Sequence, residues 1–180
     1  DVTGVQTCAL PILARFAALA DPVRQKYAAQ MSLMDDAIGD ALGALRETGQ
    51  EGHTLVFFFS DNGGPVGING SSNAPLRGAK GSVYEGGVRV PFLAAWPGRI
   101  PAGRVDARPV TSLDVFATAL GAAGVPMPSD RVYDSVNLLP YLTGEQTGAP
   151  HERLFWRSGP RLAVREGRWK LVRDAGQADE

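Results

Sequence analysis

Apolar side chains recur at intervals of three and four residues along the first quarter of the chain. This spacing places them on one stripe of an α-helix. Asp21 and Pro22 suit the helix start, because aspartate caps free N–H groups and proline fits the first helical position. Gly49 suits its end. The pattern predicts an amphipathic helix whose stripe packs in a core, and its members are Val23, Tyr27, Met31, Met34, Ile38, Leu42 and Leu45.

Two short apolar runs without alternation follow this helix, at residues 54–60 and 90–96. Such runs are typical of strands covered on both faces, as in the interior of a parallel sheet. Residues 61–90 between them are rich in glycine and show little periodicity. A loop of this length is unusual in a compact domain unless it is functional. We therefore expect two buried strands joined by a functional loop.

The second half of the chain begins with a helix signal. Thr111 and Asp114 match the capping-box pattern, and Gly124 ends the apolar face that follows. Residues 126–150 are loop-like, with one short apolar segment at 138–142.

The C-terminal part changes character. Residues 153–157 and 162–172 are strand-like, and Glu166-Gly167 divides the second run as a hairpin turn would. The order of elements predicts an α/β sheet followed by a small antiparallel unit.

Composition excludes several classes of protein. The 18 basic and 19 acidic side chains leave a net charge of −1, and no basic run indicates a nucleic-acid surface. The apolar runs are far shorter than the ~20 residues of a membrane span. The single cysteine, Cys8, cannot form an internal disulfide, and no Cys/His spacing is typical of zinc. With 22 glycines and 13 prolines, the chain should be rich in turns.

Residues 1–12 (DVTGVQTCALPI) differ from the rest. They resemble a translated sequencing-library adapter, and they lack the basic region and cleavage site of a secretory signal. We expect this segment to be non-native and the genuine protein to begin near Leu13, inside a gene. The alternative is a native, disordered N-terminus. On the first interpretation, Cys8 says nothing about the cellular compartment.

The first candidate site lies where the run 54–60 ends, in the sequence SDNGG. Asp61 and Asn62 offer a carboxylate and an amide oxygen, which are hard ligands suited to Ca²⁺ or Mg²⁺. In α/β sheets, ligands bind outside the carboxyl ends of the strands. The alternative is an Asn-Gly turn without a ligand.

The second candidate site lies in residues 76–91, where glycines flank Lys80. A lysine with little steric hindrance can contact an anion as a compact charge, although a solvated loop lysine is the alternative. The segment is not a P-loop, because Gly81 follows the lysine. Glu85 and Arg89, four residues apart, are expected to form a structural pair or to anchor the loop. His53 and His151 are expected to be structural or solvated.

Together, the two segments resemble one family. SDNGG followed by NAPLRGAKGSVYEGGVRVPFLAAWPGRIPAG is similar to the signature of the sulfatases, and the similarity extends over about residues 21–173. The resemblance implies an alkaline-phosphatase-like α/β fold, lacking its N-terminal strands here, with a small C-terminal antiparallel sheet. Residues 13–125 would be the C-terminal part of the α/β domain. Residues 126–180 would hold a loop and the start of the antiparallel subdomain.

The resemblance also implies roles for the candidate residues. Asp61 and Asn62 would bind Ca²⁺ or Mg²⁺, and Lys80 would contact the sulfate of a sulfated small molecule or sulfated carbohydrate. A cation and a lysine on one anionic ester stabilise the charge that develops in the transition state. The family hydrolyses sulfate monoesters with a formylglycine nucleophile.

One departure from the family pattern bears on activity. The Cys/Ser-x-Pro-x-Arg motif that becomes formylglycine is absent from this sequence. We expect it in a missing N-terminal part, which makes this chain a fragment that is inactive alone. The alternatives are a phosphodiesterase or phosphonate monoester hydrolase of the same superfamily, and a non-catalytic sulfatase-like binding module. A periplasmic or secreted location is suggested by the resemblance only.

Overall fold

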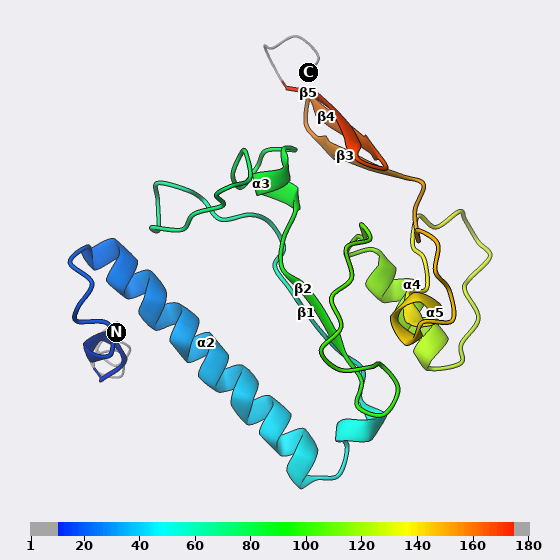
Figure 1. Ribbon diagram of the computed structural model, residues 1–180, viewed down its shortest axis with the longest axis horizontal. Coiled ribbons are helices and arrows are strands. Elements are labelled where there is room, and N and C mark those ends of the chain that lie inside the picture. Colours follow the sequence, from blue (N-terminus) through cyan, green and yellow to red (C-terminus); the bar gives the residue numbers. More distant parts are fainter. Residues whose placement is uncertain (1–10, 175–180) are drawn as a thin grey trace.

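The computed structural model describes residues 11–174 (Figure 1). Cys8 and most of the segment 1–12 lie outside the described residues, so the prediction of a non-native segment stays a prediction. In chain order, the elements are α2 (Pro22–Glu47), the 3₁₀ helix η1 (Glu51–His53), β1 (Val56–Phe59), α3 (Glu85–Val88), β2 (Phe92–Ala95), α4 (Asp114–Ala122), α5 (Leu139–Thr143), β3 (Arg153–Ser158), β4 (Arg161–Glu166) and β5 (Trp169–Arg173).

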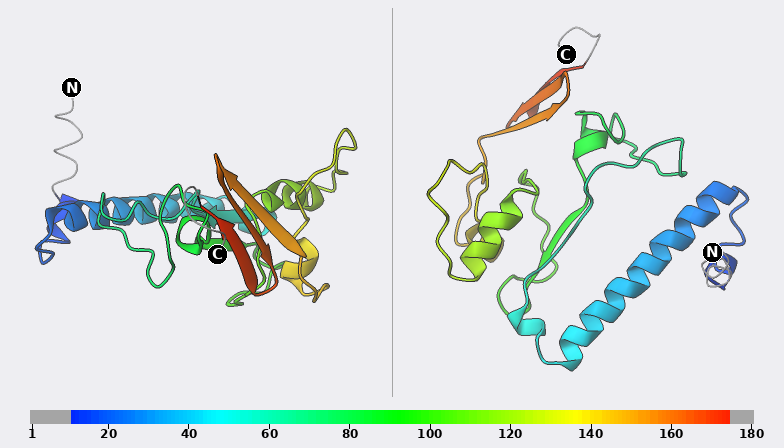
Figure 2. Two further views of the ribbon diagram at one scale, coloured as in Figure 1. Left: turned by 90° about the horizontal axis from the view of Figure 1, so that it is seen from above. Right: turned by 180° about the vertical axis from the view of Figure 1, so that it is seen from behind.

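Helix α2 forms where its periodicity predicts it. The Asp21 side chain caps it by accepting the Val23 N–H at 2.9 Å. The predicted packing is wrong for Val23, Met31 and Met34, which are 46%, 41% and 40% exposed, whereas the other members of the stripe are partly buried. The helix extends away from both sheets (Figures 1 and 2), because periodicity specifies a helical face but not its partner. Within residues 11–174, no helix combines the length and apolarity needed to cross a membrane.

Strands β1 and β2 pair with each other, whereas the apolar runs predicted strands in the interior of a parallel sheet. Their ladder is antiparallel, with Val56 opposite Ala95 and Phe59 opposite Phe92. The expectation of strands buried on both faces is also wrong here, since Phe58 and Leu93 are 38% and 57% exposed. An apolar run indicates two faces suited to burial, but it carries no information about strand direction. The antiparallel pairing brings both ends of the intervening loop to one end of the ladder.

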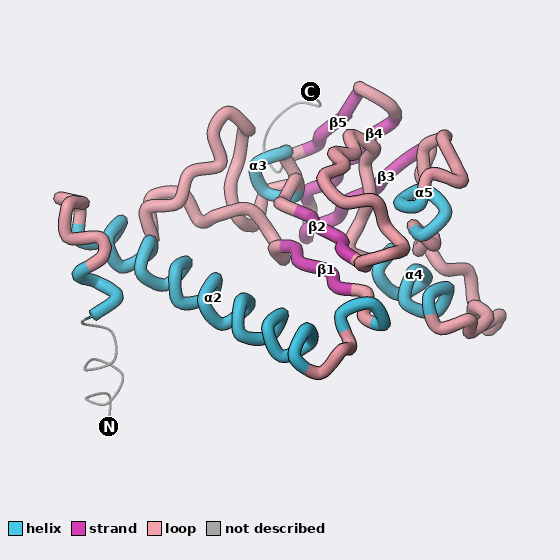
Figure 3. Tube along the Cα trace, turned by 60° about the horizontal axis from the view of Figure 1, so that its bottom comes forward, coloured by secondary structure: helices cyan, strands magenta, loops and turns pink. Residues whose placement is uncertain are grey.

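The C-terminal sheet has the order β3-β4-β5 and is antiparallel throughout. The predicted hairpin turn is confirmed, with Gly167 at a φ of 54°. One face of this sheet packs on the segment that leads into α3, and Figure 3 shows α3 beside the sheet. The cluster buried there consists of Val83, Ala163 and Val172, with Tyr84 and Trp156 at its margin.

A second buried centre joins α4 to the chain before and after α5. The carboxylate of Asp114 is fully buried. It accepts the Thr111 N–H at 2.8 Å, which confirms that half of the predicted capping box, and the Val136 N–H at 2.9 Å. His151 Nε2 lies 2.9 and 2.8 Å from the two carboxylate oxygens. His151 is therefore structural, as expected, whereas His53 is exposed in η1.

Replacing Asp114 with alanine should destabilise the fold strongly. The Asp114→Ala change leaves two partly buried N–H groups and His151 without their acceptor, and breaking an arrangement around a buried carboxylate costs about 3 kcal/mol. Urea unfolding followed by tryptophan fluorescence measures the change in the free energy of unfolding. Asp130→Ala is the matched control, because Asp130 is an exposed aspartate. Equal unfolding midpoints for the two variants would contradict this account.

Candidate functional site

The two candidate segments meet through their backbones. The Gly63 N–H donates to the Gly87 carbonyl at 2.9 Å, and the Lys80 N–H donates to the Gly64 carbonyl at 3.2 Å. A Cβ on Gly63 would lie 1.7 Å from the carbonyl oxygen of Gly86, so no side chain fits there. The glycines after Asn62 thus allow the close approach of the loop after β1 to the segment that leads into β2.

Asn73, which was not among the candidate residues predicted from the sequence, bridges the same two segments. Its Oδ1 accepts the Gly64 N–H at 2.9 Å. Its Nδ2 donates to the carbonyls of Gly64 and Gly78, at 2.9 and 3.1 Å. Backbone groups in an irregular loop need partners, and asparagine can both donate and accept. The sequence feature that could have indicated this role is an asparagine within a long loop without regular structure.

Asp61 and Asn62 leave β1 together and border one cavity. Asp61 is exposed, and Asn62 uses its Nδ2 to donate to the Gly63 carbonyl at 3.1 Å. The Asn62 backbone carbonyl is held by the Ser60 hydroxyl, which donates to it at 2.8 Å. The carboxylate of Asp61 and the amide oxygen of Asn62 are the hard donors that Ca²⁺ or Mg²⁺ prefers.

These donors fit a divalent cation only in part. Two side chains offer at most three oxygens, whereas Ca²⁺ takes ~6–8. Residues 11–174 contain no group of three or more His, Cys, Asp or Glu side chains arranged to hold a metal ion. Asp61 and Asn62 can therefore supply part of a coordination shell, and further oxygens must complete it.

The Lys80 side chain is exposed, although its backbone is held. Its ammonium group makes no hydrogen bond or ion pair within residues 11–174. Lys80 does not border the cavity that Asp61 and Asn62 line. The backbone hydrogen bonds therefore join the Asp61-Asn62 segment to the Lys80 segment. The Lys80 ammonium keeps its N–H donors available for an anionic group.

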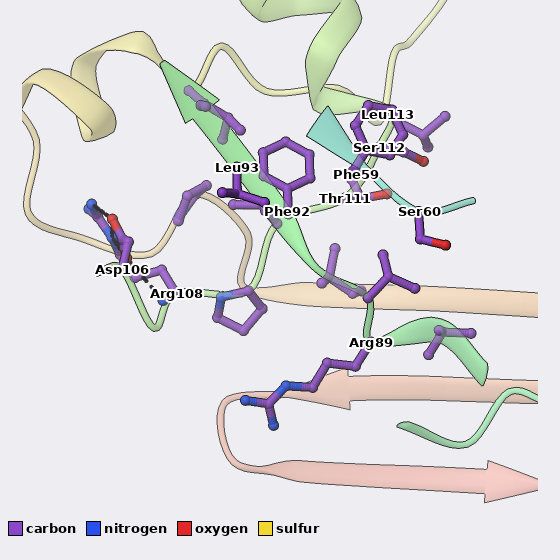
Figure 4. A pocket seen from close by; sticks show the side chains of 18 of the residues that line it. Phe59, Ser60, Arg89, Phe92, Leu93, Asp106, Arg108, Thr111, Ser112 and Leu113 are labelled. Atoms are coloured by element: carbon purple, nitrogen blue, oxygen red, sulfur yellow. Dashed lines mark hydrogen bonds and ion pairs between the residues drawn. The ribbon is translucent and has the colours of Figure 1, made fainter. Parts of the chain in front are cut away.

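The cavity itself has a volume of about 1680 Å³ and an apolar wall that includes Phe92 and Leu93 of β2 (Figure 4). Ligand pockets usually measure ~300–1,000 Å³, so this space is larger than a pocket shaped for one small ligand, and Asp61 and Asn62 are among the residues that line it. On another part of its border, the hydrogen-bonded Arg108 guanidinium lowers the pKa of Asp106 to about 2. Asp106 is thus engaged by Arg108 and does not act as a free carboxylate.

Comparison with known proteins identifies the family. The family model described as Sulfatase matches residues 7–125 of this chain. The chain belongs to the sulfatase family. Steryl-sulfatase of Mus musculus is 44% identical over 72% of the chain, and N-acetylgalactosamine-6-sulfatase of Sus scrofa is 38% identical over 89%. The matches span only 22% and 31% of the lengths of these relatives.

Solved structures agree with this assignment. The structure of Ps i-CgsB in complex with k-i-k-neocarrahexaose has a TM-score of 0.85 and 31% identity, over 94% of this chain and 38% of that one. The PsFucS1 sulfatase from Pseudoalteromonas sp. has a TM-score of 0.73 and 29% identity, over 84% of this chain and 35% of that one. The alkaline-phosphatase-like α/β fold with a small antiparallel sheet is confirmed, in part of its extent.

Substituting Gly63 should disturb this sulfatase segment at its closest backbone contact. The Gly63→Ala methyl group would meet the Gly86 carbonyl, which cannot rotate away as a side chain could, at a cost of about 3 kcal/mol. Gly39→Ala in α2 is the matched control, because a Cβ there meets nothing within 4 Å. That control should stabilise the helix by about 0.5–1 kcal/mol. Urea unfolding measures both changes, and a neutral Gly63→Ala would show that the contact is not tight in solution.

Proposed function

We propose that this chain is the C-terminal portion of a sulfatase that hydrolyses a sulfate monoester to an alcohol and inorganic sulfate. Family membership supports the reaction class. The observation that carries the proposal is the joining of the Asp61-Asn62 and Lys80 segments through Gly63 and Gly64. This joining supports a shared site for one anionic ester, because two oxygen donors and a lysine then stand on neighbouring backbone.

Each residue has a role in this proposal. Asp61 and Asn62 would hold part of the shell of a Ca²⁺ or Mg²⁺ ion, and a bound ion would polarise the oxygens of the sulfate. Lys80 binds the sulfate through its ammonium group and stabilises negative charge that develops as the ester bond breaks. A formylglycine from an upstream Cys/Ser-x-Pro-x-Arg motif would supply the nucleophile. Because residues 1–180 lack that motif, we expect no turnover from this polypeptide alone.

The substrate class is a sulfated carbohydrate or a sulfated small molecule. One relative is named for N-acetylgalactosamine 6-sulfate and another for steryl sulfates. A similar solved structure contains k-i-k-neocarrahexaose. The names of these proteins thus include both sugars and sterols, and they support a sulfate ester without selecting the alcohol.

The upstream sequence provides the first test. We expect DNA recovered upstream of the Leu13 codon to continue the reading frame into Cys/Ser-x-Pro-x-Arg. The protein expressed from the entire frame should then release sulfate from p-nitrophenyl sulfate. A frame that starts without the motif would contradict the proposal and favour a binding module. Preference for bis-p-nitrophenyl phosphate over the sulfate would indicate a phosphodiesterase.

Two substitutions test the assigned roles in that protein. Asp61→Ala and Lys80→Ala should each lower kcat/KM by about 100-fold, because the first removes a ligand of the cation and the second removes the positive charge that contacts the sulfate. Lys26→Ala is a matched control, since Lys26 is an exposed lysine on α2, and should leave kcat/KM unchanged. Added Ca²⁺ should raise the activity of the unsubstituted protein after chelation. Full activity of the Lys80→Ala variant would exclude Lys80 from sulfate binding.

A further inference from the structure

The chain that follows Lys80 lies on the C-terminal sheet. Arg161 of β4 donates from Nη1 to the carbonyl of Gly81 at 3.0 Å. Val83 is buried against Ala163 of β4 and Val172 of β5. Since the Lys80 N–H is already bonded to the loop after β1, Lys80 stands between two attachments that come from different parts of the fold.

Glu85 lies at the end of the segment that contacts the C-terminal sheet, and its carboxylate forms ion pairs with that sheet. Its Oε1 lies 2.8 Å from the Nζ of Lys170, and its Oε2 lies 3.2 Å from Nη1 of Arg165. The side chains of Glu85 and Lys170 are 26% and 11% exposed, so the pair is shielded from water. Hydrogen-bonded ion pairs of this kind are stronger than exposed ones.

The expected pairing of Glu85 with Arg89 is therefore minor. Arg89 Nη1 lies 4.0 Å from Glu85 Oε2, and the Arg89 side chain is 67% exposed. The i,i+4 rule applies to residues on a stable helix, whereas α3 is a single turn. The two closer cations come from strands 80 and 85 residues further along the chain.

The backbone that follows Glu85 contacts the residues on either side of Lys80. The Gly86 N–H donates to the carbonyl of Arg77 at 2.6 Å. A Cβ on Gly86 would lie 2.3 Å from the Gly78 carbonyl oxygen, and one on Gly87 would lie 2.2 Å from that of Ser82. Backbone packed this closely on both sides of Lys80 leaves it little room to shift independently.

We propose that Glu85 is a positioning residue for Lys80, through which the C-terminal sheet holds the sulfate-binding lysine in place. The inference rests on the proposed function of Lys80. Removing the carboxylate leaves Lys170 and Arg165 shielded without their partner, which destabilises the docked state of the loop. The ammonium of Lys80 then samples more positions, and small misplacements of a group that contacts the reacting ester lower the rate.

Hydrogen–deuterium exchange tests the anchoring directly, in the protein expressed from its entire reading frame. Glu85→Gln keeps the shape of the side chain but removes its charge. It should speed exchange of the amides at 78–88 about tenfold and leave β4 unchanged. Glu166→Gln is the matched control, because Glu166 pairs with Arg153 on the exposed edge of the same sheet. Unchanged exchange at 78–88, or equal effects of the two variants, would overturn the inference.

A double-mutant cycle tests whether Glu85 acts through Lys80. With p-nitrophenyl sulfate, Glu85→Gln should lower kcat/KM about tenfold in the otherwise unsubstituted protein and less than about twofold in the Lys80→Ala background. A loss of the same size in both backgrounds would indicate general scaffolding and overturn the inference. If the unsubstituted protein releases no sulfate, the proposed function fails, and the exchange experiment still decides whether Glu85 holds the loop.

Discussion

The close approach of two backbone segments is the constraint on which the rest of the site depends. Gly63 lies so near the carbonyl of Gly86 that a single methyl group would occupy the space between them. This contact sets the loop after β1 against the segment before β2. The Asp61-Asn62 pair and Lys80 can contribute to one site, as we propose, only because no side chain separates the backbones of Gly63 and Gly86.

In the loop between β1 and β2, side chains provide hydrogen bonds that backbone groups provide in helices and strands. The loop between β1 and β2 contains only the short helix α3 among its described elements, so most of its polar backbone groups need other partners. Asn73 satisfies three of them and joins Gly64 to Gly78. Glu85 and Arg161 attach the far part of the loop to the C-terminal sheet. The three residues hold an irregular segment without a covering helix.

The proposed function explains both the exposed apolar side chains of β1 and β2 and the small number of oxygen donors that Asp61 and Asn62 offer. The chain matches only 22% and 31% of the lengths of its relatives. A sulfatase that includes this segment would use upstream strands to cover β2 and supply the remaining oxygen ligands. The exposure of Phe58, Leu93 and part of the stripe of α2 follows from the same proposal, because their apolar patterns are suited to partners that the described residues do not provide.

The sequence by itself determined the local elements and the family. Periodicity and a capping aspartate are sufficient for α2, and a Glu-Gly turn is sufficient for the hairpin of β4 and β5, because these features depend on neighbours in the chain. The motifs around Asp61, Asn62 and Lys80 indicated the sulfatase family, because such motifs are read from short runs of neighbouring residues. Only the tertiary structure decided the antiparallel sense of β1 and β2, the bridging role of Asn73 and the pairing of Glu85 with Lys170. Each of these joins groups that are distant in sequence, and local patterns carry no information about which distant groups will meet.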